Sequence, residues 1–178
     1  PALTSGKIDA IIAGMSPTAD RKETIDFSDN YYKSDLVMVV RKGGGYENAT
    51  SIQDFSGAKI TAQLNTFHYT VIDQIKGVNK QPAMDNFPAM RVALESGMID
   101  GYVSERPEGV SATAAKENFA MVEFTDGFKT SDDDTAIAVG LPKNSDLTEK
   151  INEILAGISE EERVKIMDEA IRNQPAAE

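Results

Sequence analysis

Short apolar runs alternate with amphipathic stretches along most of this chain. Continuous apolar or β-branched segments predict strands at residues 8–13, 36–40, 58–62, 78–84, 99–103, 119–124 and 135–141. Apolar residues at helical spacing predict helices at residues 65–76, 87–96 and 106–118, and two more between residues 145 and 171. Strands that alternate with helices are typical of an α/β fold with a mainly parallel, doubly wound sheet.

A short sequence repeat links two distant parts of this pattern. Ala2–Asp9, ALTSGKID, is echoed by Ala93–Asp100, ALESGMID. Each copy is typical of a helix end, a glycine that needs positive φ, and then a buried strand. We therefore expect Gly6 and Gly97 to end helical turns. Because such a turn opens the chain at Pro1, we also expect an N-terminal portion of the domain to be missing from it.

Composition narrows the class of partner. The chain has 178 residues, with 18 basic and 29 acidic side chains, a formal net charge of −11 and no cysteine. The negative charge argues against nucleic acid as a partner, and the absence of cysteine excludes disulfides and thiolate metal sites. No apolar run reaches the roughly 18 residues of a membrane span. We expect a soluble chain with no metal and no cofactor.

Polar groups follow the first predicted strand. The Arg21 guanidinium can hold a carboxylate through two parallel charge-assisted hydrogen bonds, and Ser16 can add a donor to the same anion. A solvated surface arginine is the alternative. The place after a buried strand, where open α/β sheets bind ligands, favours the anion site.

Two further segments carry candidate ligand groups. The amides of Thr66 and Phe67 are expected at a helix N-terminus, which favours an anion, although plain N-capping explains the same residues. Glu105 comes just after the strand predicted at 99–103 and could pair with an ammonium group. The alternative is that its charge stabilises the helix that begins near Arg106.

The other candidate residues favour a structural or solvent-exposed role over a functional one. His68 has no cysteine or second histidine for a zinc site and is expected on a helix surface. Asp132–Asp134 lacks the glycine and distal glutamate of a calcium loop, so a solvated loop at 125–134 is expected. Tyr31 and Tyr32 either line a cleft or belong to the core or its rim. Because no nucleophile with its base, phosphate loop or dinucleotide motif is present, binding is favoured over catalysis.

One segment resembles a known family. Ala2–Lys42, which contains TADRKETIDFSDNYY, is similar to the polar amino-acid solute-binding proteins of ABC importers, the bacterial extracellular solute-binding family 3, and similar features continue to about Ala170. The resemblance implies an α/β fold of the type II periplasmic-binding-protein class. Two α/β lobes would be joined by a two-strand hinge, with the first lobe incomplete at its N-terminus. Lobe 1 would comprise residues 1–35 and 136–178, and lobe 2 residues 36–135.

The resemblance also implies roles for residues of this chain. Arg21 would grip the α-carboxylate of an amino acid, Ser16 would supply a hydroxyl, and Glu105 would receive the α-ammonium where the family usually has aspartate. Backbone groups and one amide side chain complete the implied set, which comprises Ala13, Gly14, Gln63, Thr66 and Phe67.

The function expected from this resemblance is transport rather than catalysis. The protein would be extracytoplasmic and anchored as a lipoprotein. It would close over a polar L-amino acid and deliver it to ABC permease subunits. A membrane tether would need a segment not present in this chain, and a missing N-terminal portion could be supplied by another chain in a homodimer or by strand exchange. The alternatives are a dehydratase acting on small carboxylates and the sensory domain of a receptor. The sequence does not indicate which amino acid binds.

Overall fold

The chain folds into two compact units. A computed structural model describes residues 1–173. The first unit consists of Pro1–Ser34 and Ser131–Arg172, and the main segment of the second is Asp35–Thr130. The lobe boundaries derived from the sequence stay a prediction, and residues 174–178 of the predicted first lobe lie outside the described residues.

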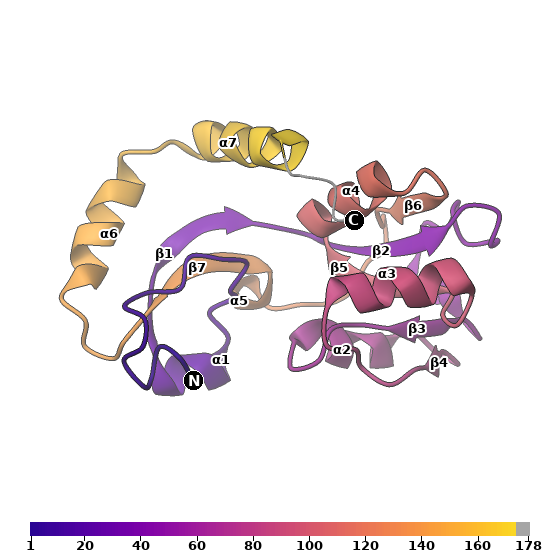
Figure 1. Ribbon diagram of the computed structural model, residues 1–178, viewed down its shortest axis with the longest axis horizontal. Coiled ribbons are helices and arrows are strands. Elements are labelled where there is room, and N and C mark those ends of the chain that lie inside the picture. The colour runs from indigo at the N-terminus through magenta and orange to yellow at the C-terminus, as the bar shows by residue number, and fades with distance from the viewer. Residues whose placement is uncertain (174–178) are drawn as a thin grey trace. The chain divides into compact units, whose positions relative to one another are not determined.

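The second unit is built on a five-stranded sheet (Figure 1). Its strands, in the order β4-β3-β5-β2-β6, are β2 (Leu36–Arg41), β3 (Lys59–Thr61), β4 (Asn79–Lys80), β5 (Gly101–Glu105) and β6 (Phe119–Val122). Strand β3 is parallel to β4 and β5, whereas β2 is antiparallel to β5 and β6. Two of the four pairings are parallel and two are antiparallel, because β2 runs against the other four strands, so the sheet is mixed rather than mainly parallel as the sequence predicted.

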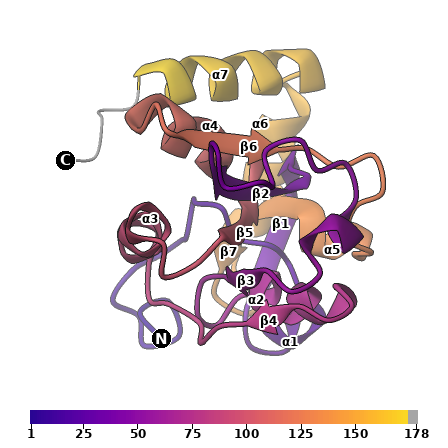
Figure 2. The same ribbon diagram turned by 90° about the vertical axis from the view of Figure 1, so that its right-hand side faces the viewer.

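Helices lie on both sides of this sheet (Figure 2). They are the 3-10 helices η1 (Ile52–Phe55) and η2 (Ile72–Gln74) and the α-helices α2 (Phe67–Val71), α3 (Phe87–Ser96) and α4 (Arg106–Ala115). Met38 of β2 belongs to one buried cluster with Ile72, and Val39 belongs to the other with Leu94. Successive side chains of a strand point to opposite faces. The continuous apolar run of β2 is therefore buried on both faces.

The first unit contains a two-stranded antiparallel ribbon (Figure 1). Its elements are β1 (Asp26–Lys33), β7 (Ala136–Leu141), α1 (Ala19–Thr24), α5 (Asp132–Thr135), α6 (Leu147–Ala156) and α7 (Glu160–Asn173). The polar loop predicted at 125–134 is wrong in its last residues, because a capping box at Ser131 starts α5.

The strand predicted at 8–13 is wrong. Its backbone pairs with β7 only at Ile11, which exchanges two hydrogen bonds of 2.8 and 3.0 Å with Gly140. Ile8 and Ile12 are 40% and 75% exposed. An apolar run forms a strand only where a neighbouring strand pairs with it along its length, and the described residues supply no such ladder here.

The two copies of the repeat share the helix end but not the strand. Gly6 and Gly97 have φ of 71° and 79°. The N–H of Lys7 donates to the Ala2 carbonyl, and the N–H of Met98 donates to the Ala93 carbonyl, each at 2.9 Å. These are the same helix-closing hydrogen bonds, for which a left-handed glycine is required.

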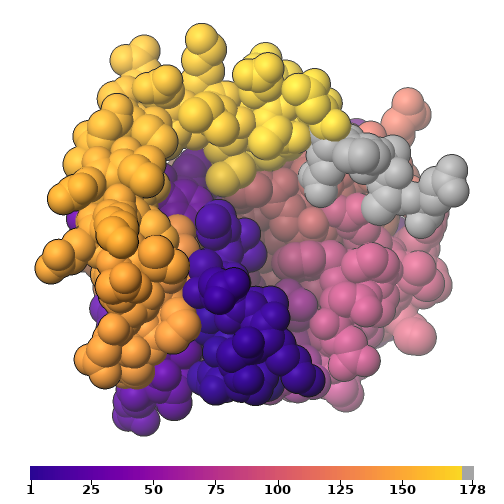
Figure 3. Space-filling view, turned by 60° about the vertical axis from the view of Figure 1, so that its left-hand side comes forward, coloured from indigo at the N-terminus to yellow at the C-terminus, as the bar shows by residue number. Residues whose placement is uncertain are grey.

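The apolar stripes of the last two helices remain open to solvent. Neither α6 nor α7 has a buried side chain among the described residues. Ile154 of α6 and Val164 of α7 are 66% and 44% exposed. Figure 3 shows α6 in orange and α7 in yellow at the surface of this unit.

Candidate functional site

Arg21 lies in α1, directly after the turn that the sequence singled out. Thr18 is the N-cap residue of this helix, and its side chain makes no cap hydrogen bond. Nη1 of Arg21 donates to the Ser16 carbonyl at 3.0 Å, which holds the half-buried guanidinium against the turn. Among residues 1–173, no carboxylate oxygen lies within 4 Å of its nitrogens. The charge of Arg21 is therefore not neutralised by an ion pair within the described chain.

The residues that precede Arg21 have internal partners. The Ser16 side chain is buried, and its hydroxyl donates to the Asp134 carbonyl at 2.8 Å. The Ala13 carbonyl accepts a hydrogen bond of 2.6 Å from the Tyr31 hydroxyl. Ala13 and Gly14 are exposed. Ala13, Gly14, Ser16 and Arg21 therefore lie close together along the chain around one turn. The hydrogen bond of Ser16 to Asp134 holds this turn against α5.

Two of the three acidic side chains of α5 pair with lysines, and the third, Asp134, accepts the Ser131 N–H of the capping box. Asp133 pairs with Lys22 at 2.6 Å and Asp132 pairs with Lys33 at 3.3 Å. Both pairs are well exposed, so each adds little stability. They nevertheless bring the acidic run of α5 against lysines and leave the Arg21 guanidinium without a carboxylate.

The second group of candidates lies in the turn between β3 and α2. Thr66 is the N-cap residue of α2, and its hydroxyl donates to the Gln63 carbonyl at 2.8 Å. Asn65 has a φ of 61°, a conformation that asparagine adopts more readily than most residues. Among the described residues the amides of Thr66 and Phe67 have no hydrogen-bond acceptor. The Thr66 side chain does not cap the helix, so these amides stay available to an anion.

Gln63 points toward its own unit. Its Nε2 donates to the Asp85 carbonyl at 3.2 Å, and its backbone bridges to Met84. The side chain therefore braces the β3 turn in this structure.

Glu105 ends β5 and is the N-cap residue of α4. Its side chain is 13% exposed and makes no capping hydrogen bond to that helix. Among the described residues, the ionisable side chain paired with it is His68, whose Nε2 lies 3.4 Å from Oε1. Glu105 thus stands at the start of α4 without a capping hydrogen bond, and the alternative that its charge stabilises this helix stays open.

The prediction of a surface histidine at His68 is wrong. His68 is 6% exposed, and it lies one helical turn before the buried Val71 and Ile72. Residues three and four apart share a helix face. That spacing is the signal in the sequence that places His68 on the buried side of α2.

A second charged cluster, which the sequence did not reveal, joins α3 to α4. Nε and Nη2 of Arg91 donate to the two carboxylate oxygens of Glu108 at 3.0 and 2.8 Å, and the Tyr102 hydroxyl donates to Glu108 at 3.1 Å. Burial raises the pKa of Glu108, and burial together with the Glu108 charge raises the pKa of Tyr102. All its groups are paired with one another, so we interpret this cluster as structural.

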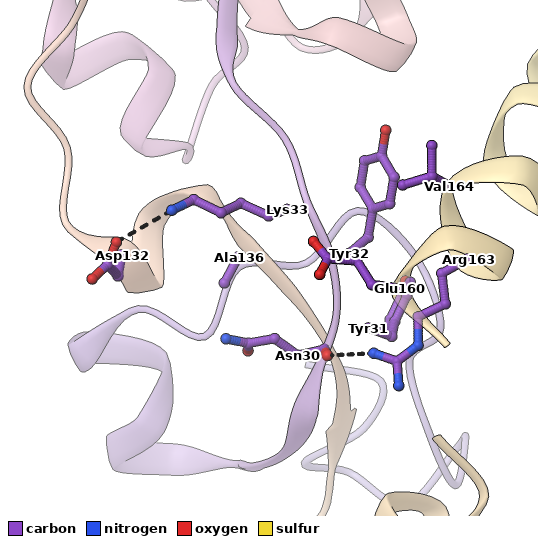
Figure 4. Close-up of a pocket in the computed structure, with 9 residues that line it drawn as sticks. All are labelled: Asn30, Tyr31, Tyr32, Lys33, Asp132, Ala136, Glu160, Arg163 and Val164. Atoms are coloured by element: carbon purple, nitrogen blue, oxygen red, sulfur yellow. Dashed lines mark hydrogen bonds and ion pairs between the residues drawn. The ribbon is translucent and has the colours of Figure 1, made fainter. Parts of the chain in front are cut away.

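A pocket of about 550 Å³ opens within the first unit, between β1 and α7 (Figure 4). Tyr31 and Tyr32 line this pocket, so the cleft is the alternative observed for these two residues. Nη1 of Arg163 donates to the Asn30 carbonyl at 3.0 Å at its edge. None of the candidate ligand residues lines this pocket.

Neither a membrane-spanning helix nor a cluster of metal ligands is found in the part of the chain that the structure describes. No helix in residues 1–173 combines the length and the apolar character that crossing a membrane requires. The same residues contain no group of three or more histidine or acidic side chains placed to hold a metal ion.

Comparison with known proteins identifies the family. Residues 1–171 match the model of the bacterial extracellular solute-binding proteins, family 3. The arginine-binding extracellular protein ArtP of Bacillus subtilis is 28% identical over 86% of this chain and 59% of its own length. A probable histidine-binding protein of Campylobacter jejuni is 34% identical over 71% of this chain and 49% of its own length.

Solved structures agree with the fold. An amino acid ABC transporter substrate-binding protein from Streptococcus pneumoniae, bound to L-arginine, superposes with a TM-score of 0.83 at 28% identity, covering 96% of this chain and 70% of that one. An ancestral arginine-binding protein bound to arginine gives a TM-score of 0.76 at 31% identity, covering 95% and 74%.

These matches settle the class of protein. The chain spans about half to three fifths of the length of the curated relatives described here. Its fold is the α/β fold of the periplasmic amino-acid-binding proteins, which confirms the predicted fold class. The family match also confirms the prediction of a binding protein rather than an enzyme. The chain belongs to the bacterial extracellular solute-binding proteins of family 3.

Proposed function

We propose that this protein binds a polar L-amino acid outside the cytoplasm and delivers it to the permease of an ABC importer. Arg21 would hold the ligand's carboxylate and Glu105 its ammonium, with closure of two lobes over the ligand. Anchoring as a lipoprotein would keep it near the permease. The observation that carries the proposal is the half-buried Arg21 guanidinium, which has no carboxylate within 4 Å among residues 1–173.

The charge of the protein makes this observation informative. In a chain of net charge −11, acidic side chains are abundant, yet none pairs with Arg21 among the described residues. A desolvated guanidinium gains from a bidentate carboxylate partner, which an amino acid supplies. The amides of Thr66 and Phe67 would add uncharged donors to the same carboxylate.

The relatives suggest which ligands to try first. Those described above are named for arginine and histidine, and another structurally similar ancestral protein was solved with glutamine. Net surface charge steers encounter but does not define a pocket. A thermal-shift panel of the common amino acids should therefore precede calorimetry, since bound ligand raises the melting temperature.

The decisive experiment replaces Arg21 by alanine. Two charge-assisted hydrogen bonds contribute about 3 kcal/mol or more, which corresponds to at least roughly 100-fold in affinity. Isothermal titration calorimetry with the amino acid that gives the largest thermal shift should show that loss for Arg21→Ala. The control is Arg106→Ala, which removes an exposed arginine paired with Glu123 at 2.9 Å and should leave the affinity unchanged. Equal affinities of the Arg21→Ala variant and the wild type would refute the assignment.

A further inference from the structure

His68 is a buried polar residue that the proposed function does not yet use. It is the one histidine of the chain. Its side chain is 8% exposed, and both Nδ1 and Nε2 are buried without a hydrogen-bond partner in the described structure. Nε2 nevertheless lies 3.4 Å from Oε1 of Glu105, close enough for an ion pair but outside hydrogen-bond geometry.

The surroundings of the imidazole leave Glu105 as the acid that faces it. Two elements pack against α2, namely η2 and β5. The acid of η2, Asp73, is paired with Lys80 at 2.8 Å. On α2 itself, the Tyr69 hydroxyl donates to the Gln81 carbonyl, and the Phe67 ring covers the imidazole with ring centroids 4.5 Å apart.

Removing the Glu105 carboxylate and the His68 imidazole from water without giving them hydrogen bonds costs folding free energy. A protonated imidazole offsets part of that cost by placing a positive charge beside Glu105. A carboxylate with that single partner still has unused acceptor capacity, because an ionised carboxyl group has about four lone-pair positions. It can therefore accept a second cation, and an ammonium group fits that need.

We propose that His68 is a positioning residue of the amino-acid site, which holds the Glu105 carboxylate for the ligand's α-ammonium. This inference rests on the proposed function, because it assigns to Glu105 the role of ammonium acceptor. Two cations beside one carboxylate repel each other, so ligand binding should favour the neutral imidazole. By linkage, protonation of His68 and binding of the ligand's ammonium group should oppose each other.

The single histidine makes the first test unambiguous. In the 178-residue protein, the imidazole NMR signals can be followed against pH with and without a saturating amino acid from the thermal-shift panel. The expected result is a titration midpoint that moves to lower pH with ligand. Glu105→Gln should abolish this effect of the ligand. A titration of the wild-type protein that is the same with and without the ligand would overturn the inference.

The second test separates positioning from mere packing. His68→Leu should weaken binding of the amino acid about tenfold, because the Glu105 carboxylate would lose the polar group that faces it. It should leave unchanged the binding of an analogue that lacks the α-amino group. His68→Gln, which keeps a donor, should recover part of the loss. Tyr69→Phe, one residue further along α2, is the matched control and should alter neither affinity.

The outcomes distinguish this inference from the function on which it rests. Absence of binding by every amino acid in the wild-type protein would overturn the proposed function and the role of His68 with it. Binding of an amino acid, with equal losses for amino acid and analogue in both His68 variants, would overturn the role of His68 alone. Circular dichroism of each variant verifies its fold, and His68→Gln decides the matter if His68→Leu does not fold.

Discussion

Replacing Arg91 by methionine would leave the Glu108 carboxylate in the second unit without its counter-charge. The two side chains are 11% and 13% exposed, and two hydrogen bonds of 3.0 and 2.8 Å join them. Removing one partner of such a buried pair strands the other charge, which costs about 3–5 kcal/mol. Methionine keeps most of the aliphatic volume of arginine, so the change measures the lost charge more than a cavity.

The pH dependence of this loss identifies its cause. Burial already raises the pKa of Glu108, and Arg91 opposes that rise. Without Arg91 the folded-state pKa rises further above the unfolded value of about 4.3. A raised carboxyl pKa favours the folded state at acid pH, and that advantage disappears as the pH rises through the folded-state pKa. The destabilisation by Arg91→Met should therefore be largest near neutrality and shrink toward pH 5.

Urea unfolding followed by circular dichroism at neutral and acid pH measures both effects. The matched control is Arg106→Met, because Arg106 pairs with Glu123 at 2.9 Å but the two side chains are 45% and 59% exposed. That exposed pair should contribute about 0–1 kcal/mol. Adding Glu108→Gln to Arg91→Met should restore part of the stability, since a neutral amide is cheaper to bury than a lone charge. Equal losses for Arg91→Met and Arg106→Met at neutral pH would refute the reasoning.

Two further predictions concern the repeat and the acid stability of the first unit. Gly97→Ala should lower the free energy of unfolding by somewhat more than the roughly 1–2 kcal/mol of a left-handed alanine, because its Cβ would lie 2.9 Å from Nη1 of Arg41 and displace that group from its 2.8 Å hydrogen bond to the Leu94 carbonyl. Gly6→Ala has open space around its Cβ and should lose only the conformational part; equal losses in urea unfolding would contradict this. Hydrogen bonds from Lys143 and the Asn144 amide lower the pKa of Asp26. That contribution is complete above the unfolded pKa of about 3.9 and is lost as the pH falls through the folded value. Lys143→Met should therefore reduce stability at neutral pH, with a difference from wild type that fades in acid; a difference independent of pH would contradict it.

Local patterns predicted several elements of the second unit because their signals are self-contained, although the strand predicted at 78–84 is only Asn79–Lys80 and the helix predicted at 65–76 divides into α2 and η2. The helix at 87–96 is observed with the predicted bounds, with an Asn86 side-chain cap at its start and Gly97 at its end. The run at 36–40 is buried at every position, as a central strand requires. Each of these features depends on residues a few positions apart, which the sequence displays directly.

The same reasoning failed where the outcome depends on partners distant in the chain. The run at 8–13 has the composition of a strand but lacks a ladder, and the stripes of α6 and α7 have the period of a buried face but are at most half-buried among the described residues. An apolar segment is more stable when it is buried. Whether burial occurs depends on the elements that pack against the segment.

For the candidate site, the sequence by itself determined the chemistry of its parts. Arg21 after a turn, Glu105 at the end of a strand and amides at the start of a helix follow from local order along the chain, and all three are observed in those places. Only the tertiary structure decided which charges are neutralised. It placed the acids of α5 against lysines and left Arg21 without a carboxylate, and it buried His68 against Glu105. Coulomb energies depend on distance and desolvation in space, and neither quantity can be read from positions in the chain.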